Sequence, residues 1–264
     1  MNGGSSPAAD RPARGRESDG GERGASSGGS ERPVAVVVDY GAGNLPSIVR
    51  ALEVAGADVV LAASPERVGH PDVVVVPGVG AQAPAMRRLH RTGLAGAIER
   101  AVDDGGWYLG ICLGLQVLFE RSEEDGSRGL GWLRGDTRRL RSATTLPHIG
   151  WNGVDPVTRH PLLDGLPAGV PMYFVHSYAP DPEDRSIVVA ETEHGGRFAS
   201  VIAAGRLLGV QFHPEKSGRD GIRLLRNALA IAAGRTPGAE LLAAETTGPI
   251  GSPRDPDGRL SPCC

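Results

Sequence analysis

The strongest constraint on the fold comes from two short apolar runs that are rich in β-branched residues. Val34–Val38 and Val73–Val76 contain no polar residue at alternate positions, which is typical of strands covered on both faces in a parallel sheet. Segments with helical spacing separate such runs. Right-handed crossovers between the strands give an open sheet whose ligand crevice lies at the strand carboxyl ends. We therefore expect an α/β fold with three layers, in which helices flank an open, mostly parallel sheet.

Three segments have apolar residues at helical spacing. Leu45–Ala55 is the clearest, with Asn44 able to cap its start and Gly56 able to end it. A second helix is expected within Ala83–Asp104, although two glycines interrupt its middle, and a third around Ile222–Ala232. These helices supply the layers on the two faces of the sheet.

Between and beyond these elements the pattern changes. Gly129–Ala190 has shorter alternating segments, which predict an added antiparallel sheet beside the main one. Residues 1–32 and 236–264 are rich in Gly, Ser, Pro and charged residues, and such segments cannot bury enough apolar surface to order themselves. The sequence thus predicts one domain over residues 33–235 and two disordered tails.

Composition excludes several classes of function. The 264 residues are 40% hydrophobic, enough for a substantial core, and the net charge of −3 with no basic patch argues against a nucleic-acid partner. No apolar run reaches the roughly 18 residues that a membrane helix needs. The three cysteines, Cys112, Cys263 and Cys264, form neither a disulfide framework nor a metal-site pattern. We therefore expect a cytoplasmic protein without a metal.

Cys112 lies where an apolar run meets a glycine-bracketed turn and a second apolar segment. Gly110 and Gly114 flank it at the spacing of a nucleophile elbow, in which small residues avoid clashes at a strained strand-to-helix turn. A helix N-terminus at that turn would favour a thiolate. The alternative is a buried structural cysteine, so the interpretation depends on a catalytic partner.

His213 and Glu215 provide that partner after another apolar run. If the run is a strand, residues two apart point to one face, so Glu215 can orient the imidazole of His213. Pro214 between them suggests that the strand ends there. Taken alone, His213 could be a strand-end histidine with an acidic neighbour. Together with Cys112, the pair forms the arrangement that activates a thiol for acyl transfer.

The order of Cys112, His213 and Glu215 resembles the class I glutamine amidotransferases. From about Val34 to about Gly234 the chain is similar to the glutaminase subunits of imidazole glycerol phosphate synthase within that class. Four further runs carry this resemblance: Asp39-Tyr40-Gly41-Ala42-Gly43-Asn44-Leu45, Pro77-Gly78-Val79-Gly80, His148-Ile149-Gly150-Trp151-Asn152 and Tyr173-Phe174-Val175-His176-Ser177-Tyr178. The resemblance implies an enzyme that hydrolyses glutamine to glutamate and ammonia through a cysteine thioester, without a cofactor.

The resemblance also implies roles for residues around the nucleophile. Leu113 and the turn Gly78-Val79-Gly80 would supply oxyanion donors, and Gln116, Ser177 and Tyr178 are candidates to hold the glutamine. For these last three, an ordinary polar or capping role is an equal alternative.

A partner is implied as well. Ammonia would pass through a channel to a cyclase subunit, a (β/α)8 barrel, which forms imidazole glycerol phosphate and aminoimidazole carboxamide ribonucleotide in histidine biosynthesis. Such a barrel takes about 250 residues, so a second chain must supply it in a heterodimer. Asn44, Trp151, Asn152 and Lys216 occupy motif positions toward that interface. Trp151 could instead be core and Lys216 a solvated charge.

Two departures from the family pattern stand out. The run Ala81-Gln82-Ala83-Pro84-Ala85-Met86 lacks an expected aromatic residue and adds a proline, and Pro46 replaces a residue that is usually polar or basic. Two other readings also remain. Glutaminase subunits of the pyridoxal phosphate and anthranilate pathways share the cysteine triad, and a non-catalytic binding module could share the fold.

Overall fold

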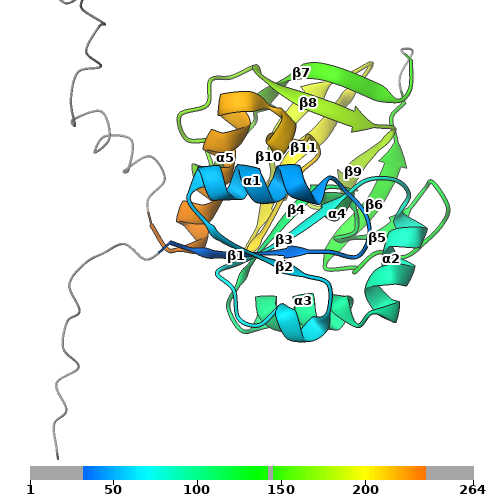
Figure 1. Ribbon diagram of the computed structural model, residues 1–264. Helices are drawn as coiled ribbons and strands as arrows, with labels where there is room; N and C mark the ends of the chain where they lie inside the picture. Colours follow the sequence, from blue (N-terminus) through cyan, green and yellow to red (C-terminus); the bar gives the residue numbers. More distant parts are fainter. Residues whose placement is uncertain (1–31, 142–144, 236–264) are drawn as a thin grey trace, which may run out of the picture. The chain divides into compact units, whose positions relative to one another are not determined.

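The chain's structure, a computed structural model, describes residues 32–141 and 145–235 (Figure 1). The two predicted tails lie outside the described residues, apart from Arg32. Their disorder therefore stays a prediction. Arg32 donates through its guanidinium to the carbonyl oxygens of Glu53, Gly56 and Ala57.

A nine-stranded mixed sheet forms the centre of the described region. In the order in which they lie side by side, its strands are β2 (Asp58–Ala62), β1 (Val34–Val38), β3 (Val73–Gly78), β4 (Trp107–Cys112), β12 (Leu207–Val210), β11 (Arg197–Ala204), β10 (Val188–Glu193), β7 (His148–Pro156) and β8 (Val170–His176). The strands from β2 to β12 run parallel, and those from β12 to β8 pair antiparallel. The parallel half agrees with the sequence prediction.

A smaller sheet consists of β5 (Phe119–Ser122), β6 (Leu133–Arg139) and β9 (Tyr178–Pro182). Strands β6 and β9 are antiparallel, as expected, whereas β5 runs parallel to β6. The segment predicted as one added antiparallel sheet is therefore divided. Its strands β7, β8 and β10 extend the main sheet, because alternation predicts strands without specifying which strand each will pair with.

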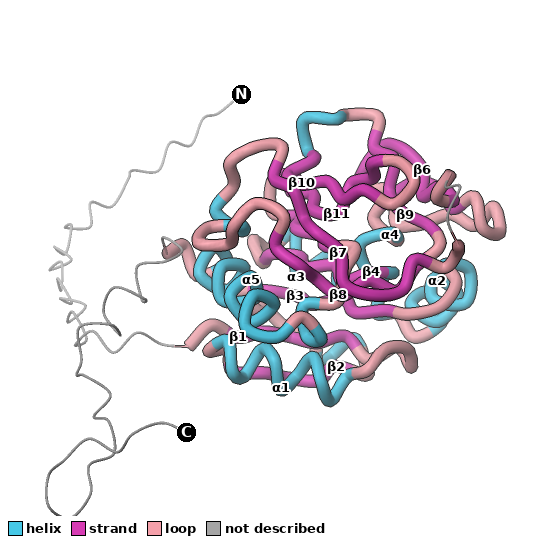
Figure 2. Tube along the Cα trace, turned by 90° about the horizontal axis from the view of Figure 1, so that it is seen from above, coloured by secondary structure: helices cyan, strands magenta, loops and turns pink. Residues whose placement is uncertain are grey.

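Five α-helices lie in the described region: α1 (Leu45–Ala55), α2 (Gln82–Arg91), α3 (Leu94–Asp103), the short α4 (Leu113–Gln116) and α5 (Gly218–Ala232). Short 3₁₀ turns span Pro65–Arg67, Pro161–Leu163, Arg185–Ile187 and Pro214–Lys216. Helices α1 and α5 lie side by side on one face of the sheet, and α2 and α3 lie on the other (Figures 1 and 2).

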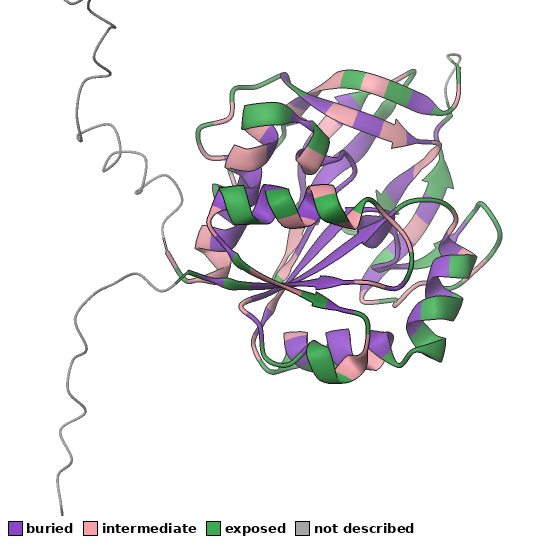
Figure 3. Cartoon of the chain, viewed as in Figure 1, coloured by how far each residue is buried: buried purple, intermediate pink, exposed green. Residues whose placement is uncertain are grey.

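Burial on both faces explains the uninterrupted apolar runs. Val73 and Val75 pack into the core beneath α1 and α5, whereas Val74 and Val76 pack into the core beneath α2 and α3. The central strands are accordingly buried along their length (Figure 3). No position on such a strand faces water, so none needs to be polar.

The helix predictions hold with three changes. Helix α1 has the expected bounds and ends at Gly56, whose φ of 108° suits glycine, but the Asn44 side chain makes no capping hydrogen bond. The second predicted helix is two helices, because Gly93 adopts a left-handed conformation between them. Helix α5 begins at Gly218, a turn earlier than its apolar spacing indicated.

Candidate active site

Cys112 occupies a strained turn between β4 and α4. Its φ of 54° and ψ of −107° make it the one non-glycine residue with positive φ in the described part of the chain. A β-carbon on Gly110 would lie 2.5 Å from the Gly114 carbonyl oxygen, and one on Gly114 would lie 1.7 Å from that of Val76. The two glycines thus allow backbones to meet where the thiol is presented, as the elbow pattern predicts.

His213 is fixed close to this turn by the backbone around it. Strand β12 runs parallel to β4, so His213, three residues beyond its end, reaches the edge where Cys112 lies. The His213 N–H donates to the carbonyl of Tyr173 (2.8 Å), and the Ser217 hydroxyl donates to the carbonyl of His213 (2.7 Å). These two hydrogen bonds fix the backbone of His213 through its N–H group and its C=O group.

The imidazole and its carboxylate form a buried pair. Nδ1 of His213 lies 2.8 Å from Oε1 of Glu215, and the two side chains are only 3% and 1% exposed. The spacing of two residues predicted that His213 and Glu215 share one face of a strand, but neither residue lies on a strand. Strand β12 ends at Val210, and the 3₁₀ turn Pro214–Lys216 brings Glu215 back to the ring.

Electrostatic interactions favour a protonated His213. Burial lowers its pKa, but hydrogen bonding and charge interactions with Cys112 and Glu215 outweigh it and raise the pKa to about 9. Nε2 of the ring and Oε2 of Glu215 are buried without a standard hydrogen bond in the described region. The imidazole can therefore carry a proton at neutral pH and has one nitrogen left for a reacting group.

A cavity of about 300 Å³ opens beside Cys112. Six other predicted site residues line it: Val79, Gly80, Leu113, Gln116, Ser177 and Tyr178. Gly78 does not line it but pairs in register with Cys112 across β3 and β4. Tyr40, for which the sequence predicted no role, donates to the carbonyl of Pro77 (2.8 Å) and so supports the start of this turn.

The side chain of Gln116 is held in place by hydrogen bonds within the protein. Its Nε2 donates to the carbonyl of Tyr178 (2.8 Å) and to Oε1 of Gln211 (3.0 Å). Both amide hydrogens are thus engaged, and its Oε1 remains for a ligand. Gln211 and His176, which also lines the cavity, were missed because nothing in one chain's spacing distinguishes a buried polar residue near a site from one in a core.

The four predicted interface residues differ in their surroundings. Asn44 is exposed before α1, and Trp151 is 58% exposed on β7 with its ring in a T-shaped arrangement with that of Tyr173. Lys216 is exposed, and its Nζ lies 5.5 Å above the Tyr173 ring. The Asn152 amide instead has internal partners, the carbonyl of Glu193 and the ring of His148.

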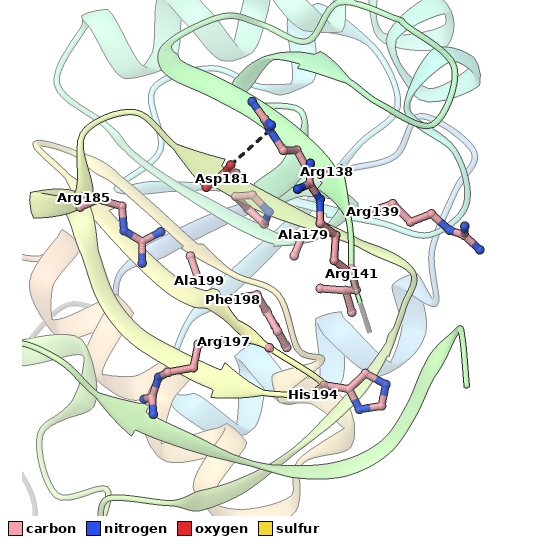
Figure 4. Close-up of a pocket in the computed structure, with 13 residues that line it drawn as sticks. Arg138, Arg139, Arg141, Ala179, Asp181, Arg185, His194, Arg197, Phe198 and Ala199 are labelled. Atoms are coloured by element: carbon pink, nitrogen blue, oxygen red, sulfur yellow. Dashed lines mark ion pairs between the residues drawn. The ribbon is translucent and has the colours of Figure 1, made fainter. Parts of the chain in front are cut away.

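A second cavity, of about 260 Å³, is lined by arginines from several elements (Figure 4). Nε of Arg138 lies 3.2 Å from Oδ2 of Asp181, and Nε of Arg197 lies 2.9 Å from Oε2 of Glu191, which also contacts Arg185. These ion pairs offset much of the positive charge. Because this cavity also lacks a nucleophile, the cavity at Cys112 is the candidate active site.

The described residues contain neither a metal-binding cluster nor a membrane-spanning helix. No group of three or more His, Cys, Asp or Glu side chains within residues 32–141 and 145–235 is arranged to hold a metal ion. No helix of that same part is long and apolar enough to cross a membrane.

Known proteins match this chain over most of its described length. Residues 36–232 match the family glutamine amidotransferase class-I. The chain is 46% identical over 193 residues to imidazole glycerol phosphate synthase subunit HisH of Symbiobacterium thermophilum, covering 73% of this chain and 91% of the relative. Against the subunit of the same name from Aquifex aeolicus it is 46% identical over 194 residues, covering 73% and 94%.

Solved structures show the same fold at lower sequence identity. PurLQS from Thermotoga maritima has a TM-score of 0.61 at 19% identity, covering 76% of this chain and 99% of the other. A second structure, titled a glutamine amidotransferase, has a TM-score of 0.60 at 18% identity, covering 75% and 98%. Such similarity is evidence for the arrangement of strands and helices alone.

Proposed function

Because this chain belongs to the class I glutamine amidotransferases, and among them to the HisH subunits of imidazole glycerol phosphate synthase, we propose that Cys112, His213 and Glu215 are its catalytic triad. The chain is the glutaminase subunit of that synthase. The observation that supports the triad most directly is the strained Cys112 turn beside a buried His213–Glu215 pair. Curated relatives covered over nine-tenths of their length favour this subunit over those of the pyridoxal phosphate or anthranilate pathways.

The reaction divides into two acyl transfers. The Cys112 thiolate attacks the δ-carbonyl carbon of glutamine, and Nε2 of the protonated His213 gives its proton to the departing nitrogen as the C–N bond breaks. Ammonia leaves and a γ-glutamyl thioester remains. Water then attacks the thioester while Nε2 accepts its proton, which releases glutamate and restores the thiolate and imidazolium. Glu215, bonded to Nδ1, keeps the imidazole oriented and stabilises its charged form.

Backbone donors beside the cavity suit the oxyanion that forms in each step. Leu113 is the first residue of α4, where a helix leaves its N–H groups without partners. Val79 and Gly80 line the same cavity, and we propose that this segment, with Gly78, contributes the second N–H. Loss of one such donor typically lowers kcat about 100- to 1,000-fold.

The amino-acid part of glutamine would lie against the wall formed by Gln116, Ser177 and Tyr178. These residues line the cavity beside Cys112, and the orientation of Gln116 presents its Oε1 to a ligand. An acceptor at that position suits the α-ammonium group of glutamine, which carries only donors.

The name of the relatives implies a second subunit, and we propose that it is the (β/α)8 cyclase. Val79, Ile149 and Trp151 are among the few large apolar side chains that are exposed, at 46%, 60% and 58%. With Asn44 and Lys216 they would form the docking surface of a heterodimer, in which ammonia passes to the cyclase. Asn152 would support this surface through its bonds to β7 and β10 neighbours. We propose a cytoplasmic location, where the Cys112 thiol stays reduced.

Glutamate release tests this function. The purified chain mixed with a cyclase subunit of imidazole glycerol phosphate synthase should release glutamate from glutamine, and the cyclase's ribonucleotide substrate should stimulate it. Cys112→Ala should abolish release, whereas Cys263→Ala should not. Release that appears only with a pyridoxal phosphate or anthranilate synthase partner would contradict the assignment.

A further inference from the structure

Gln211 is a fully buried polar residue to which the mechanism above gives no part. It lies between the end of β12 and His213, and its backbone N–H donates to the carbonyl of Ser200 (2.9 Å). Its side-chain Nε2 donates to Sγ of Cys112 at 3.5 Å. A buried amide hydrogen is thus directed at the atom that attacks glutamine.

The orientation of this amide follows from an acceptor that cannot be reversed. The carbonyl oxygen of Tyr178 can only accept, so the Gln116 atom 2.8 Å from it must be Nε2. That same nitrogen lies 3.0 Å from the Gln211 side chain, which must therefore present Oε1 to it. The remaining end of the Gln211 amide, toward Cys112, is the donor.

We propose that Gln211 is a further catalytic residue, whose side-chain amide donates to Sγ of Cys112 and stabilises the thiolate form. The inference rests on the proposed role of Cys112 as nucleophile. A hydrogen bond to the charged form of a group favours that form, and charge strengthens the bond. This contact should raise the ratio of thiolate to thiol at a given pH by about tenfold to a hundredfold.

Gln116 acts on this contact as a positioning residue. It joins the Tyr178 carbonyl, which also lies 2.9 Å from Nδ1 of His176, to Gln211 and so to the nucleophile. The backbone carbonyl of Gln116 in turn accepts from the Thr137 hydroxyl (3.3 Å). Elements distant in sequence thus hold the Gln211 amide in one orientation before glutamine binds.

Several titratable groups lie around the sulfur or its cavity and must be separated from the effect of Gln211. His213 follows β12 and interacts with Cys112, as does Tyr40 after β1. The other titratable groups that line the cavity are Glu124, His176 and Tyr178. A measurement that reports on sulfur alone is therefore needed.

Ultraviolet thiolate absorbance provides such a measurement on the full chain. Subtracting the spectrum of the Cys112→Ala variant removes the other cysteines and the tyrosines. Gln211→Met keeps the length of the side chain but has no donor, so the midpoint of Cys112 ionisation should rise by about one to two pH units. With the cyclase partner, kcat for glutamine hydrolysis should fall by about tenfold to a hundredfold while KM changes little. Gln211→Glu, which repels a thiolate, should shift the midpoint at least as far.

Asn227→Leu is the matched control. Asn227 is a buried amide on α5 that donates to the carbonyls of Leu162 and Asp164, so this variant loses a comparable amide without changing the Cys112 midpoint.

If Gln211→Met does not fold, Gln211→Asn, whose amide is one methylene short of the sulfur, decides by the same titration. An unchanged midpoint in a folded Gln211 variant would overturn the proposal, even with reduced kcat. If the Gln211 variants shift the midpoint of Cys112 ionisation as expected but the wild-type chain releases no glutamate, the result counts against the proposed function and not against the role of Gln211.

Discussion

At the scale of single residues, two buried histidines near the same cavity have pKa values shifted in opposite directions, because their hydrogen-bond partners differ. The pKa of His213 is raised to about 9: burial opposes the shift, but Cys112 and Glu215 outweigh it. The pKa of His176 is lowered to about 3, chiefly by burial, since its neighbours are a carbonyl and other histidines. A carboxylate within hydrogen-bonding distance thus separates a proton carrier from a neutral structural imidazole.

Glu215→Gln tests that difference. The amide retains the size of the side chain but removes the negative charge beside Nδ1, so the pKa of His213 should fall by at least about one unit. The kcat for glutamine should fall about 100-fold or more, because the imidazolium is less populated and less well oriented. NMR titration of the His213 ring checks the first result. Glu191→Gln, on a remote ion pair, should leave the His213 titration unchanged, and an unshifted ring in Glu215→Gln would contradict the account.

The same pKa shift predicts how stability depends on pH. Because the pKa of His213 is raised on folding, its favourable contribution is complete below the unfolded value of about 6.5 and is lost as the pH rises through about 9. The stability difference between wild type and His213→Gln should therefore shrink between pH 6 and pH 10, by on the order of 3 kcal/mol. Urea unfolding of both proteins at several pH values measures it. A difference that grows with pH would show that the sign is wrong.

At the scale of elements, sequence predicted what depends on local spacing. The bounds of α1 follow from its helical spacing and those of β1 from an uninterrupted apolar run, and the Cys112 turn follows from its glycines. Pairing over long distances could not be predicted: β7 and β10 join the main sheet, and Gln211 meets a cysteine 99 residues away. Alternation predicts that a segment is a strand, but its partner is decided by the packing of the whole chain.

Gly114→Ala tests the elbow as an element. The added β-carbon would lie 1.7 Å from the carbonyl oxygen of Val76, which is backbone and cannot rotate away. The free energy of unfolding should fall by at least about 2 kcal/mol, and glutamate release should be lost even in the folded fraction, because the turn shifts Cys112. Chemical denaturation and the coupled glutaminase assay measure these two effects.

Gly196→Ala is the comparison for that variant. Among the described residues, a β-carbon on Gly196 would have only the Arg141 carbonyl oxygen near it, at 3.8 Å, and Gly196 lines the arginine-rich cavity rather than the cavity at Cys112. Stability should change by less than about 0.5 kcal/mol. Equal losses in the two variants would mean that close packing at the elbow is not the cause.

At the scale of the whole molecule, residues 32–235 should be sufficient for folding and activity. They include both sheets and the helices on each face, whereas the composition of the rest predicts disorder. Arg32 should be retained, since its guanidinium binds three carbonyls at the end of α1. A chain of residues 32–235 should unfold within about 2 °C of the full chain, and Arg32→Ala in it should cost roughly 1 kcal/mol. A large loss of stability on removing the tails would contradict the domain boundaries.

An exposed apolar side chain near the active site, Trp151, leads to a prediction about association with the partner subunit. Trp151 is 58% exposed on β7, near Tyr173 and Lys216, and a large aromatic side chain that is desolvated on binding often contributes 2 kcal/mol or more. Trp151→Ala should therefore weaken association with the cyclase subunit about 30-fold or more, while thermal unfolding of the isolated chain changes little. Calorimetric titration measures the affinity. Val157→Ala, one residue beyond the end of β7 and also an exposed apolar side chain, should leave it unchanged. If both variants bind as wild type does, the docking surface lies elsewhere, and the dependence of glutaminase turnover on the partner would have to arise without contact at Trp151.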